Sequence, residues 1–148
     1  MPDPPCLICA GQRGEGPLVA PVVWRDDLVW VKHVVNHPAP VTLGHLVVET
    51  DRHAPYVDSL TDQEAAAVGL ARRRAAVALR AELHAEAVHA FVSSRALEHF
   101  HEHVLVRHPG TPADVLWHQV ADAASARHGD IEDVQELCRR LARHFPSD

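Results

Sequence analysis

The chain lacks a long apolar run and is poor in aromatic residues. Its 148 residues include one tyrosine, one methionine and three cysteines, and aromatic residues make up 5% of the total. No apolar stretch approaches the roughly 20 residues that span a bilayer. The start, Met-Pro-Asp-Pro-Pro, has neither the basic nor the apolar region of a signal peptide. We therefore expect a soluble, cytoplasmic protein with no membrane partner.

An excess of basic residues is also missing. The chain has 14 lysines and arginines against 20 aspartates and glutamates, which gives a net charge of −6. Proteins that hold long nucleic acid usually present a basic face. The basic residues here are scattered, apart from Arg72, Arg73 and Arg74, which fit a solvated helix face. Long nucleic acid is therefore not an expected partner, whereas one phosphate group needs only a few local donors.

The cysteines are too few for a disulfide framework, and their number is odd. Cys6 and Cys9 form a C-x-x-C, which is typical of half a zinc site or of a redox pair. A thioredoxin-type redox pair should follow a strand and open a helix. The residues after this motif indicate a loop instead: Gly11, Gly14, Gly16 and Pro17. The sequence therefore favours a metal over redox chemistry.

Apolar periodicity predicts an α+β fold. Strands are expected over residues 19–23, 28–35, 45–49, 88–93 and 98–107. Thr61 and Glu64 form a capping box that starts a helix running to about His84. Further helices are expected over 113–127 and from Asp130 onwards. Without a repeat or a linker, residues 1–148 are predicted to form a single domain, with an N-terminal loop over 1–18 and a helical extension over 113–148.

Three of the thirteen histidines alternate along the last expected strand. Because side chains on a strand alternate with period two, His99, His101 and His103 share one face, with about 7 Å between successive Cβ atoms. Three imidazoles are costly to bury without partners. This face is therefore expected to meet a ligand, a metal or polar groups.

Imidazole on that face suits two kinds of chemistry. It is a good nucleophile while neutral, and its pKa lies near working pH. A histidine that attacks phosphorus forms a covalent intermediate that water then opens, and its neighbours can bind phosphoryl oxygens and protonate the leaving group. In the alternative, two of the three histidines chelate a catalytic metal, as H-x-H pairs on strands do. A His-rich surface strand without a function is the third interpretation.

The H-x-H-x-H run and four further segments resemble, in order, the histidine triad (HIT) family. The four segments are CLIC at 6–9, PVTLGHLVV at 40–48 followed by DRH at 51–53, LTDQE at 60–64 and RHPGTP at 107–112. The resemblance covers about residues 6–112. It implies a HIT-like α+β fold, in which an antiparallel sheet of about five strands carries a long helix, with extra C-terminal helices in this chain.

The resemblance also implies roles for single residues. His101 would be the nucleophile that takes the nucleotidyl group, and His103 would contact the phosphate and help to protonate the leaving group. Residues 1–18 would form a zinc-binding loop, and the ligands of this structural zinc would be Cys6, Cys9, His53 and His99. The protein would be a homodimer that binds a small nucleotide substrate.

Two segments depart from the family pattern. The family usually has Gly-Gln-Ser/Thr before the triad, whereas this chain has Ser94-Arg95-Ala96. Arg95 is therefore the expected charged donor to the phosphate, beside Ser94. The acidic residue that would bind the ribose hydroxyls is missing, and Asn36 and His37 stand in that region. This difference allows for a modified or non-adenine substrate.

Three functions remain after these arguments. The main hypothesis is a nucleotidyl hydrolase that cleaves a P–N or P–O–P bond at the α-phosphate and releases a nucleoside monophosphate, with nucleoside phosphoramidates and dinucleoside polyphosphates as the two substrate classes. The second is a metal-dependent hydrolase with its ion on His101 and His103. The third is a non-catalytic nucleotide-binding module. Among the other histidines, His45 is expected to be a structural hydrogen-bonder and His33 a surface or rim residue.

Overall fold

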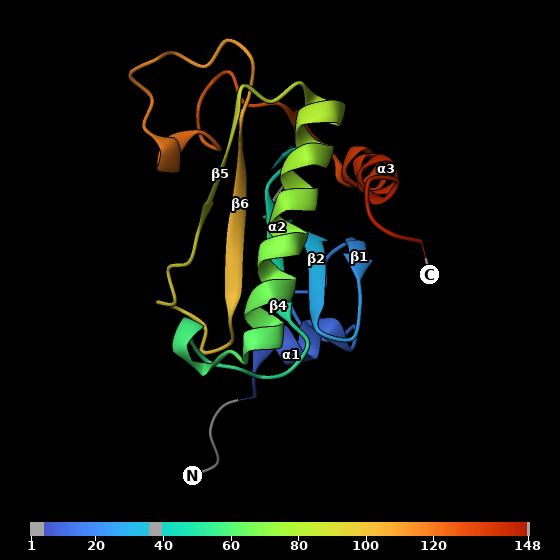
Figure 1. The fold of residues 1–148 in the computed structure, drawn as a ribbon. Coiled ribbons are helices and arrows are strands. Elements are labelled where there is room, and N and C mark those ends of the chain that lie inside the picture. Colours follow the sequence, from blue (N-terminus) through green and yellow to red (C-terminus); the bar gives the residue numbers. More distant parts are fainter. Residues whose placement is uncertain (1–4, 36–39, 148) are drawn as a thin grey trace.

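Helices and strands form an α+β fold in a computed structural model that describes residues 5–35 and 40–147 (Figure 1). The elements are α1 (Leu7–Gln12), β1 (Val22–Arg25), β2 (Val29–His33), β3 (Val41–Thr42), β4 (Leu46–Thr50), α2 (Asp62–Leu83), β5 (Ala87–Phe91), β6 (His101–Arg107), β7 (His128–Gly129) and α3 (Ile131–Ala142). In the described part of the chain, no helix is both long and apolar enough to cross a membrane.

The main sheet has five strands in the order β1-β2-β4-β6-β5, and every neighbouring pair is antiparallel. The long helix α2 lies across one face of this sheet, and α3 packs against α2 and β1 (Figure 1). Strands β3 and β7 form a separate two-stranded sheet. The expected α+β class and the five-stranded antiparallel sheet with its long helix are confirmed.

Helix α2 begins where the sequence predicts it. The Thr61 side chain accepts a hydrogen bond from the backbone N–H of Glu64, and the Glu64 carboxylate accepts one from the backbone N–H of Thr61. This capping box satisfies two backbone donors at the helix start. The helix ends at His84, whose φ of 53° is left-handed. Its sheet-facing side is rich in alanine, which lets the helix approach the strands closely.

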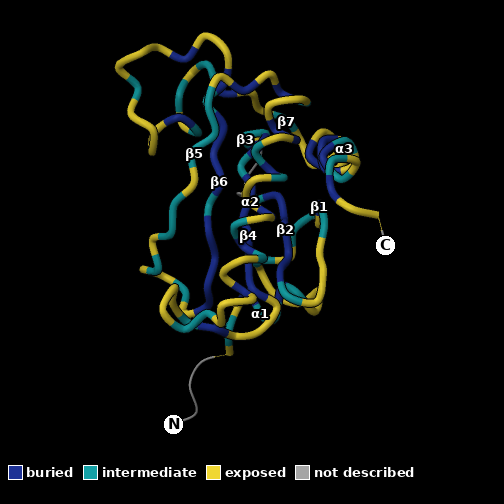
Figure 2. The backbone as a smooth tube through the Cα atoms, in the orientation of Figure 1, coloured by how far each residue is buried: buried dark blue, intermediate teal, exposed yellow. Residues whose placement is uncertain are grey.

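The core lies between α2 and the sheet. Its strand members include Val29 and Val31 of β2, Val48 of β4 and Val104 of β6, and Figure 2 shows these strands buried over most of their length. Because side chains alternate along a strand, the residues between them point to the opposite face. That second face carries His101 and His103.

The C-x-x-C segment differs from its prediction as a loop. Cys6 is the N-cap of helix α1, and its Sγ accepts a hydrogen bond from the backbone N–H of Cys9 at 3.4 Å. The helix has only 6 residues, so it is too short to show an apolar period. The motif therefore opens a short helix, contrary to the prediction, although no strand of the described chain precedes it.

The predicted helix over 113–127 is also wrong. This segment consists of turns and one 3₁₀ turn, Trp117–Gln119. Near its start, the guanidinium of Arg107 donates to the carbonyl oxygen of Val115 at 3.0 Å and to that of Pro112, just before the segment. The Pro112 carbonyl also accepts from the backbone N–H of Val115 at 3.1 Å, which closes a turn. The C-terminal extension contains one α-helix, α3, with Asp130 as its N-cap as expected.

Candidate catalytic and metal-binding site

A cavity of about 310 Å³ opens on the sheet face that carries the histidines. The segment after α1 and the segment before β6 form its sides, and strands β2, β4 and β6 contribute to its lining. The residues that line it are Ile8, Pro17, Leu18, Val19, Ala20, Lys32, His33, Val34, Val35, Val47, Glu49, Ser93, Arg95, Ala96, Leu97, His101 and His103. Mostly apolar walls with a few polar groups are typical of a small-molecule site.

His101 is held by one hydrogen bond to the main chain. Its Nδ1 lies 2.7 Å from the carbonyl oxygen of His99. A carbonyl oxygen can only accept, so Nδ1 carries the hydrogen and Nε2 keeps a free lone pair in the neutral ring. The ring lines the cavity although the residue is only 8% exposed. In the neutral form of the ring, this arrangement leaves the Nε2 lone pair available for nucleophilic attack.

His103 is positioned by two other aromatic side chains. Its Nδ1 lies 3.0 Å from Nε2 of His45, and its ring stacks on Phe91 with 5.0 Å between centroids. Burial is the main cause that lowers the pKa of His103 below its ordinary value and that of His45 to about 3. Both rings are therefore neutral at pH 7 in the free protein. The prediction that His45 makes a structural hydrogen bond is confirmed, and its partner is His103.

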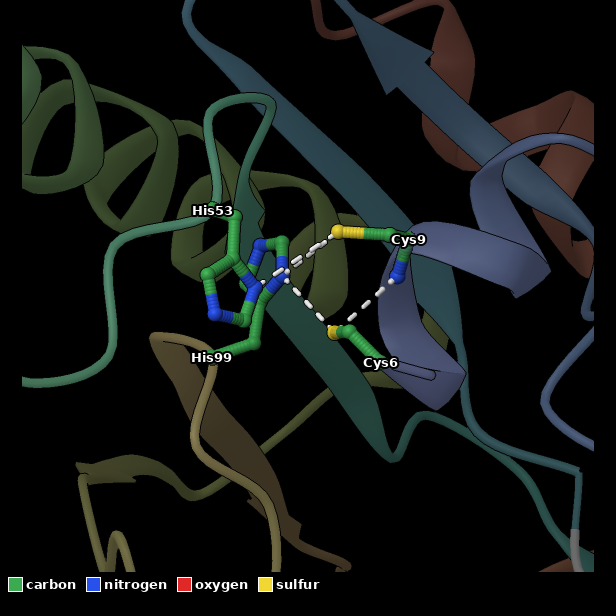
Figure 3. A group of neighbouring side chains, drawn as sticks. All are labelled: Cys6, Cys9, His53 and His99. Atoms are coloured by element: carbon green, nitrogen blue, oxygen red, sulfur yellow. Dashed lines mark hydrogen bonds between the residues drawn. The ribbon is translucent and has the colours of Figure 1, made fainter. Parts of the chain in front are cut away.

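The four predicted zinc ligands lie together (Figure 3). One ligand atom from each of Cys6, Cys9, His53 and His99 lies within 4.8 Å of the others. Nδ1 of His99 is 3.3 Å from the sulfur of Cys6 and 3.3 Å from that of Cys9, and Nδ1 of His53 is 3.6 Å from the sulfur of Cys9. In a tetrahedral zinc site, sulfur and nitrogen ligands stand about 3.5 Å apart. The donor set and its spacing therefore fit zinc.

A neighbouring carbonyl fixes the ring of His99 for this role. Its Nε2 donates to the carbonyl oxygen of Thr50 at 2.7 Å, which leaves Nδ1 without a hydrogen and free to bind a metal. Burial is the main cause that raises the pKa of the Cys9 thiol to about 11 in the metal-free chain, so metal binding must displace a proton. Within the described residues, His101 and His103 belong to no such ligand group.

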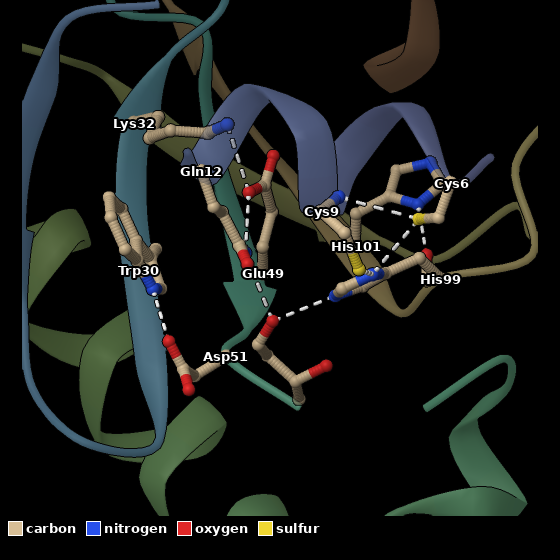
Figure 4. Close-up of polar contacts among 10 residues, drawn as sticks. Cys6, Cys9, Gln12, Trp30, Lys32, Glu49, Asp51, His99 and His101 are labelled. Atoms are coloured by element: carbon tan, nitrogen blue, oxygen red, sulfur yellow. Dashed lines mark hydrogen bonds and ion pairs between the residues drawn. The ribbon is translucent and has the colours of Figure 1, made fainter. Parts of the chain in front are cut away.

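An ion pair that the sequence does not predict lies in the cavity wall (Figure 4). Nζ of Lys32 is 3.0 Å from Oε2 of Glu49, and the two side chains are 2% and 5% exposed. Gln12 donates to the same oxygen at 3.2 Å. Burial is the largest influence on Glu49 and raises the pKa of its carboxyl, against the opposing effects of Lys32 and Gln12. Lys32 lies on β2 and Glu49 on β4, and β3 stands between these two strands in the sequence. No local sequence pattern therefore reveals the ion pair.

Comparison with known proteins identifies the fold. No family model and no curated protein matches this sequence. The structure is similar to a zinc-bound histidine triad family protein from Mycobacterium smegmatis, with 22% identity, a TM-score of 0.71 and 93% of each chain covered. The chain has the histidine triad fold.

Two further structures with this fold match. A HIT-like protein involved in cell-cycle regulation from Bartonella henselae shares 17% identity, with a TM-score of 0.73 over 97% of this chain and 98% of that one. Plasmodium falciparum diadenosine triphosphate hydrolase shares 14% identity, with a TM-score of 0.59 over 83% of this chain and 74% of that one. The histidine triad fold therefore includes a hydrolase of a dinucleotide substrate.

The remaining predicted residues of the histidine triad site are placed as follows. Arg95 is exposed and lines the cavity, as does Ser93. Among the described residues, Ser94 does not line the cavity, and its φ of 51° is left-handed. Asn36 and His37, predicted near the ribose and base, lie outside the described residues. Ser93, which the sequence does not single out, therefore brings a hydroxyl to the cavity in place of the predicted Ser94.

One prediction about a neighbouring residue was wrong. His33, expected at the surface or rim, is fully buried, and it donates from Nδ1 to the Val34 carbonyl and accepts from Gly44 N–H at 2.9 Å. Gly44 stands eleven residues further along the chain, so local polarity gives no indication that His33 is buried. Arg72 is exposed on α2 as expected, and its guanidinium also forms an ion pair with the buried Glu102 on the α2 side of the sheet.

Proposed function

We propose that this chain is a histidine triad hydrolase that cleaves a P–N or P–O–P bond at the α-phosphate of a nucleotide conjugate. The observation that carries the proposal is the ring of His101, which lines the cavity with Nδ1 hydrogen-bonded and Nε2 free. The cavity suits a nucleoside, since apolar walls accommodate a flat base while polar groups fix its orientation. The homodimeric state implied by the resemblance and the cytoplasmic location expected from the sequence are part of the same proposal.

The first step forms a covalent adduct. An anionic phosphate beside His103 favours the charged form of that ring, so His103 enters the reaction with Nδ1–H donated to His45 and Nε2–H available. The lone pair of His101 Nε2 forms a bond to the α-phosphorus while the bond to the leaving group breaks. His103 gives its Nε2 proton to the leaving nitrogen or oxygen and becomes neutral. The His99 carbonyl stabilises the positive charge that His101 acquires.

The second step is hydrolysis. A water molecule gives a proton to the neutral Nε2 of His103 as its oxygen bonds to phosphorus, and the bond from His101 to phosphorus breaks. The products are a nucleoside monophosphate and the original His101. Arg95, an exposed cationic side chain that lines the cavity, can neutralise the phosphoryl oxygens.

The metal group has a structural role in this proposal. Zinc held by Cys6, Cys9, His53 and His99 would supply a cross-link rather than a Lewis acid, because four protein ligands close the coordination sphere. The cross-link would fix the chain at His99, whose carbonyl orients His101.

Replacing the nucleophile tests the proposal. His101→Ala is expected to lower turnover by at least about 10³-fold, while zinc content and the circular dichroism spectrum stay unchanged. The measurement is release of nucleoside monophosphate from nucleoside phosphoramidates and from dinucleoside polyphosphates. His128→Ala, at an exposed histidine of β7, is the matched control and should retain full activity. Near-normal turnover in His101→Ala would contradict the mechanism.

A nucleotide-binding module without turnover is the second candidate. It is favoured by the segment before the triad, where Ser94 does not line the described part of the cavity. This candidate predicts binding of nucleoside monophosphates together with no product from either substrate class. The same panel of substrates therefore separates the two functions.

A further inference from the structure

The buried pair of Lys32 and Glu49 has no part in the chemistry of His101, yet it lies beside it. Glu49 on β4 is directly opposite His101 on β6, and directly opposite Trp30 on β2. Lys32 follows Trp30 by two residues, so it lies on the same sheet face. Both charged side chains line the cavity.

The pair keeps unused hydrogen-bonding capacity. An ammonium has three donors, but among the described residues no acceptor meets Lys32 Nζ in hydrogen-bonding geometry, although Glu49 lies 3.0 Å away. Within residues 5–35 and 40–147, Lys32 and Gln12 both contact Oε2 of Glu49, which leaves Oε1 for another donor. Buried charges with unmade hydrogen bonds are costly. A ligand that supplies one acceptor to Lys32 and one donor to Glu49 would satisfy the unused hydrogen-bonding capacity of both side chains.

The walls around the pair restrict the shape of that ligand. Ile8 of α1, Leu18 and Val35 line the cavity together with Val47 and Leu97. Apolar walls of this kind accept the faces of a flat ring, and the polar edge of the ring is left to meet the charged groups. The occupant is therefore a flat heterocycle whose edge carries an acceptor beside a donor.

We propose that Lys32 and Glu49 select a 6-oxopurine base, guanine or hypoxanthine, over adenine. The inference rests on the proposed function. Lys32 donates to the O6 carbonyl, and Glu49 accepts from the adjacent N1–H. Adenine carries an amino group and a bare ring nitrogen at these two positions, so it places donor against donor and acceptor against acceptor. Lysine contacts to guanine O6 are a common basis for such discrimination.

Equilibrium binding of GMP, IMP and AMP to the full chain, measured by calorimetry, tests this selection. GMP and IMP are expected to bind at least about tenfold more tightly than AMP. In the double variant Lys32→Met/Glu49→Gln, which is neutral and similar in shape, the ratio is expected to fall within about threefold while AMP affinity changes little. The double variant Arg139→Met/Glu136→Gln removes an exposed ion pair of α3 and should keep the full preference.

Other outcomes overturn the inference. AMP binding as tight as GMP binding in the unmodified chain contradicts it, and so does an undiminished preference in the double variant. If the double variant fails to fold, the single variant Glu49→Gln is measured instead, and it is expected to lower the affinity for GMP more than the affinity for AMP. Turnover that depends on His101 without any base preference removes this inference and leaves the proposed hydrolysis standing. Failure of all three monophosphates to bind contradicts both.

Discussion

At the scale of single residues, the hydrogen bond between His45 and His103 shows how one side chain fixes the orientation of another. His45 is half-buried at the start of β4, and its Nε2 is 3.0 Å from Nδ1 of His103. This bond orients the His103 ring toward the cavity. His45 does not line the cavity among the described residues, so it is a positioning residue rather than a catalytic one.

We expect His45→Phe to lower kcat by roughly 10- to 100-fold with a smaller effect on KM, because proton transfer by His103 needs a fixed ring. His45→Gln, which keeps a hydrogen-bonding side chain, should recover part of the loss. Steady-state kinetics on the better of the two substrate classes measures both. An unchanged kcat in His45→Phe would show that Phe91 alone suffices to hold His103.

The sequence predicts residues whose signal is local and misses residues whose partners are distant. The alternation of side chains along a strand places His101 and His103 on one face. The grouping of Cys6 and Cys9 with two distant histidines, by contrast, is predicted only by the family resemblance. Lys32, by contrast, stands in an apolar run, and its partner Glu49 is reached only after β2 and β4 pair. No single-sequence pattern reports that pairing.

At the scale of elements, Gly44 shows how the loop before β4 fits against helix α2. Its φ is +89°, and a Cβ at this position would lie 2.7 Å from Cδ1 of Leu83 and 2.9 Å from Cγ2 of Val106. Its N–H also donates to His33. The residue before His45 is therefore fixed by both backbone conformation and space.

We expect Gly44→Ala to lower the free energy of unfolding by about 2–4 kcal/mol, from overpacking and from the left-handed backbone. Gly69→Ala, inside α2, is the matched control, because nothing lies within 4 Å of its added Cβ. It should raise stability by about 0.5–1 kcal/mol through helix propensity. Urea unfolding measures both, and equal effects would refute the packing argument.

The boundaries of helices and strands are likewise predicted where their cause is local in sequence and missed where it is distant. The start of α2 is predicted because its capping box lies within four residues of sequence. The segment over 113–127 forms turns instead of the predicted helix, and near its start the Val115 carbonyl accepts from Arg107 of β6, a contact that no local pattern reports. Helix α1 escapes prediction because its six residues are too few to show periodicity.

At the scale of the whole molecule, buried neutral histidines make stability depend on pH. Burial lowers the pKa of His33 to about 4, against an ordinary value near 6.5. Between these values the unfolded chain binds a proton that the folded chain does not. Stability is therefore complete above about pH 6.5 and falls as the pH drops toward 4.

For His33→Gln we expect a shallower decline of the unfolding free energy with falling pH than in the unmodified chain. One proton corresponds to about 1.4 kcal/mol per pH unit, so the slopes between pH 6 and pH 4.5 should differ by up to roughly that amount. Urea titrations at several pH values give both slopes. Because both proteins share the same metal ligands, parallel curves would exclude His33 as the origin.

Metal removal is expected to destabilise the whole molecule. The four ligands join residues 6 and 9 to residues 53 and 99, so a bound metal stabilises the folded state alone. Chelation should lower Tm by roughly 5–15 °C, and added zinc should restore it. Cys138→Ser, at a buried cysteine outside the ligand group, should leave the zinc stoichiometry unchanged. An unaltered Tm after complete chelation would exclude a structural metal.

The short helix α1 contributes to both the metal-binding group and the cavity. Cys6 is its N-cap and Cys9 lies within it, Ile8 lines the cavity, and Gln12 donates to Glu49. A helix of this length does not persist without tertiary support, so its fold state sets the shape of the binding wall. Zinc and nucleotide bound as proposed would therefore be thermodynamically linked, and reciprocity would require each to change the affinity for the other by the same factor. Zinc supply, acting through six residues, would then set how much nucleotide the protein holds.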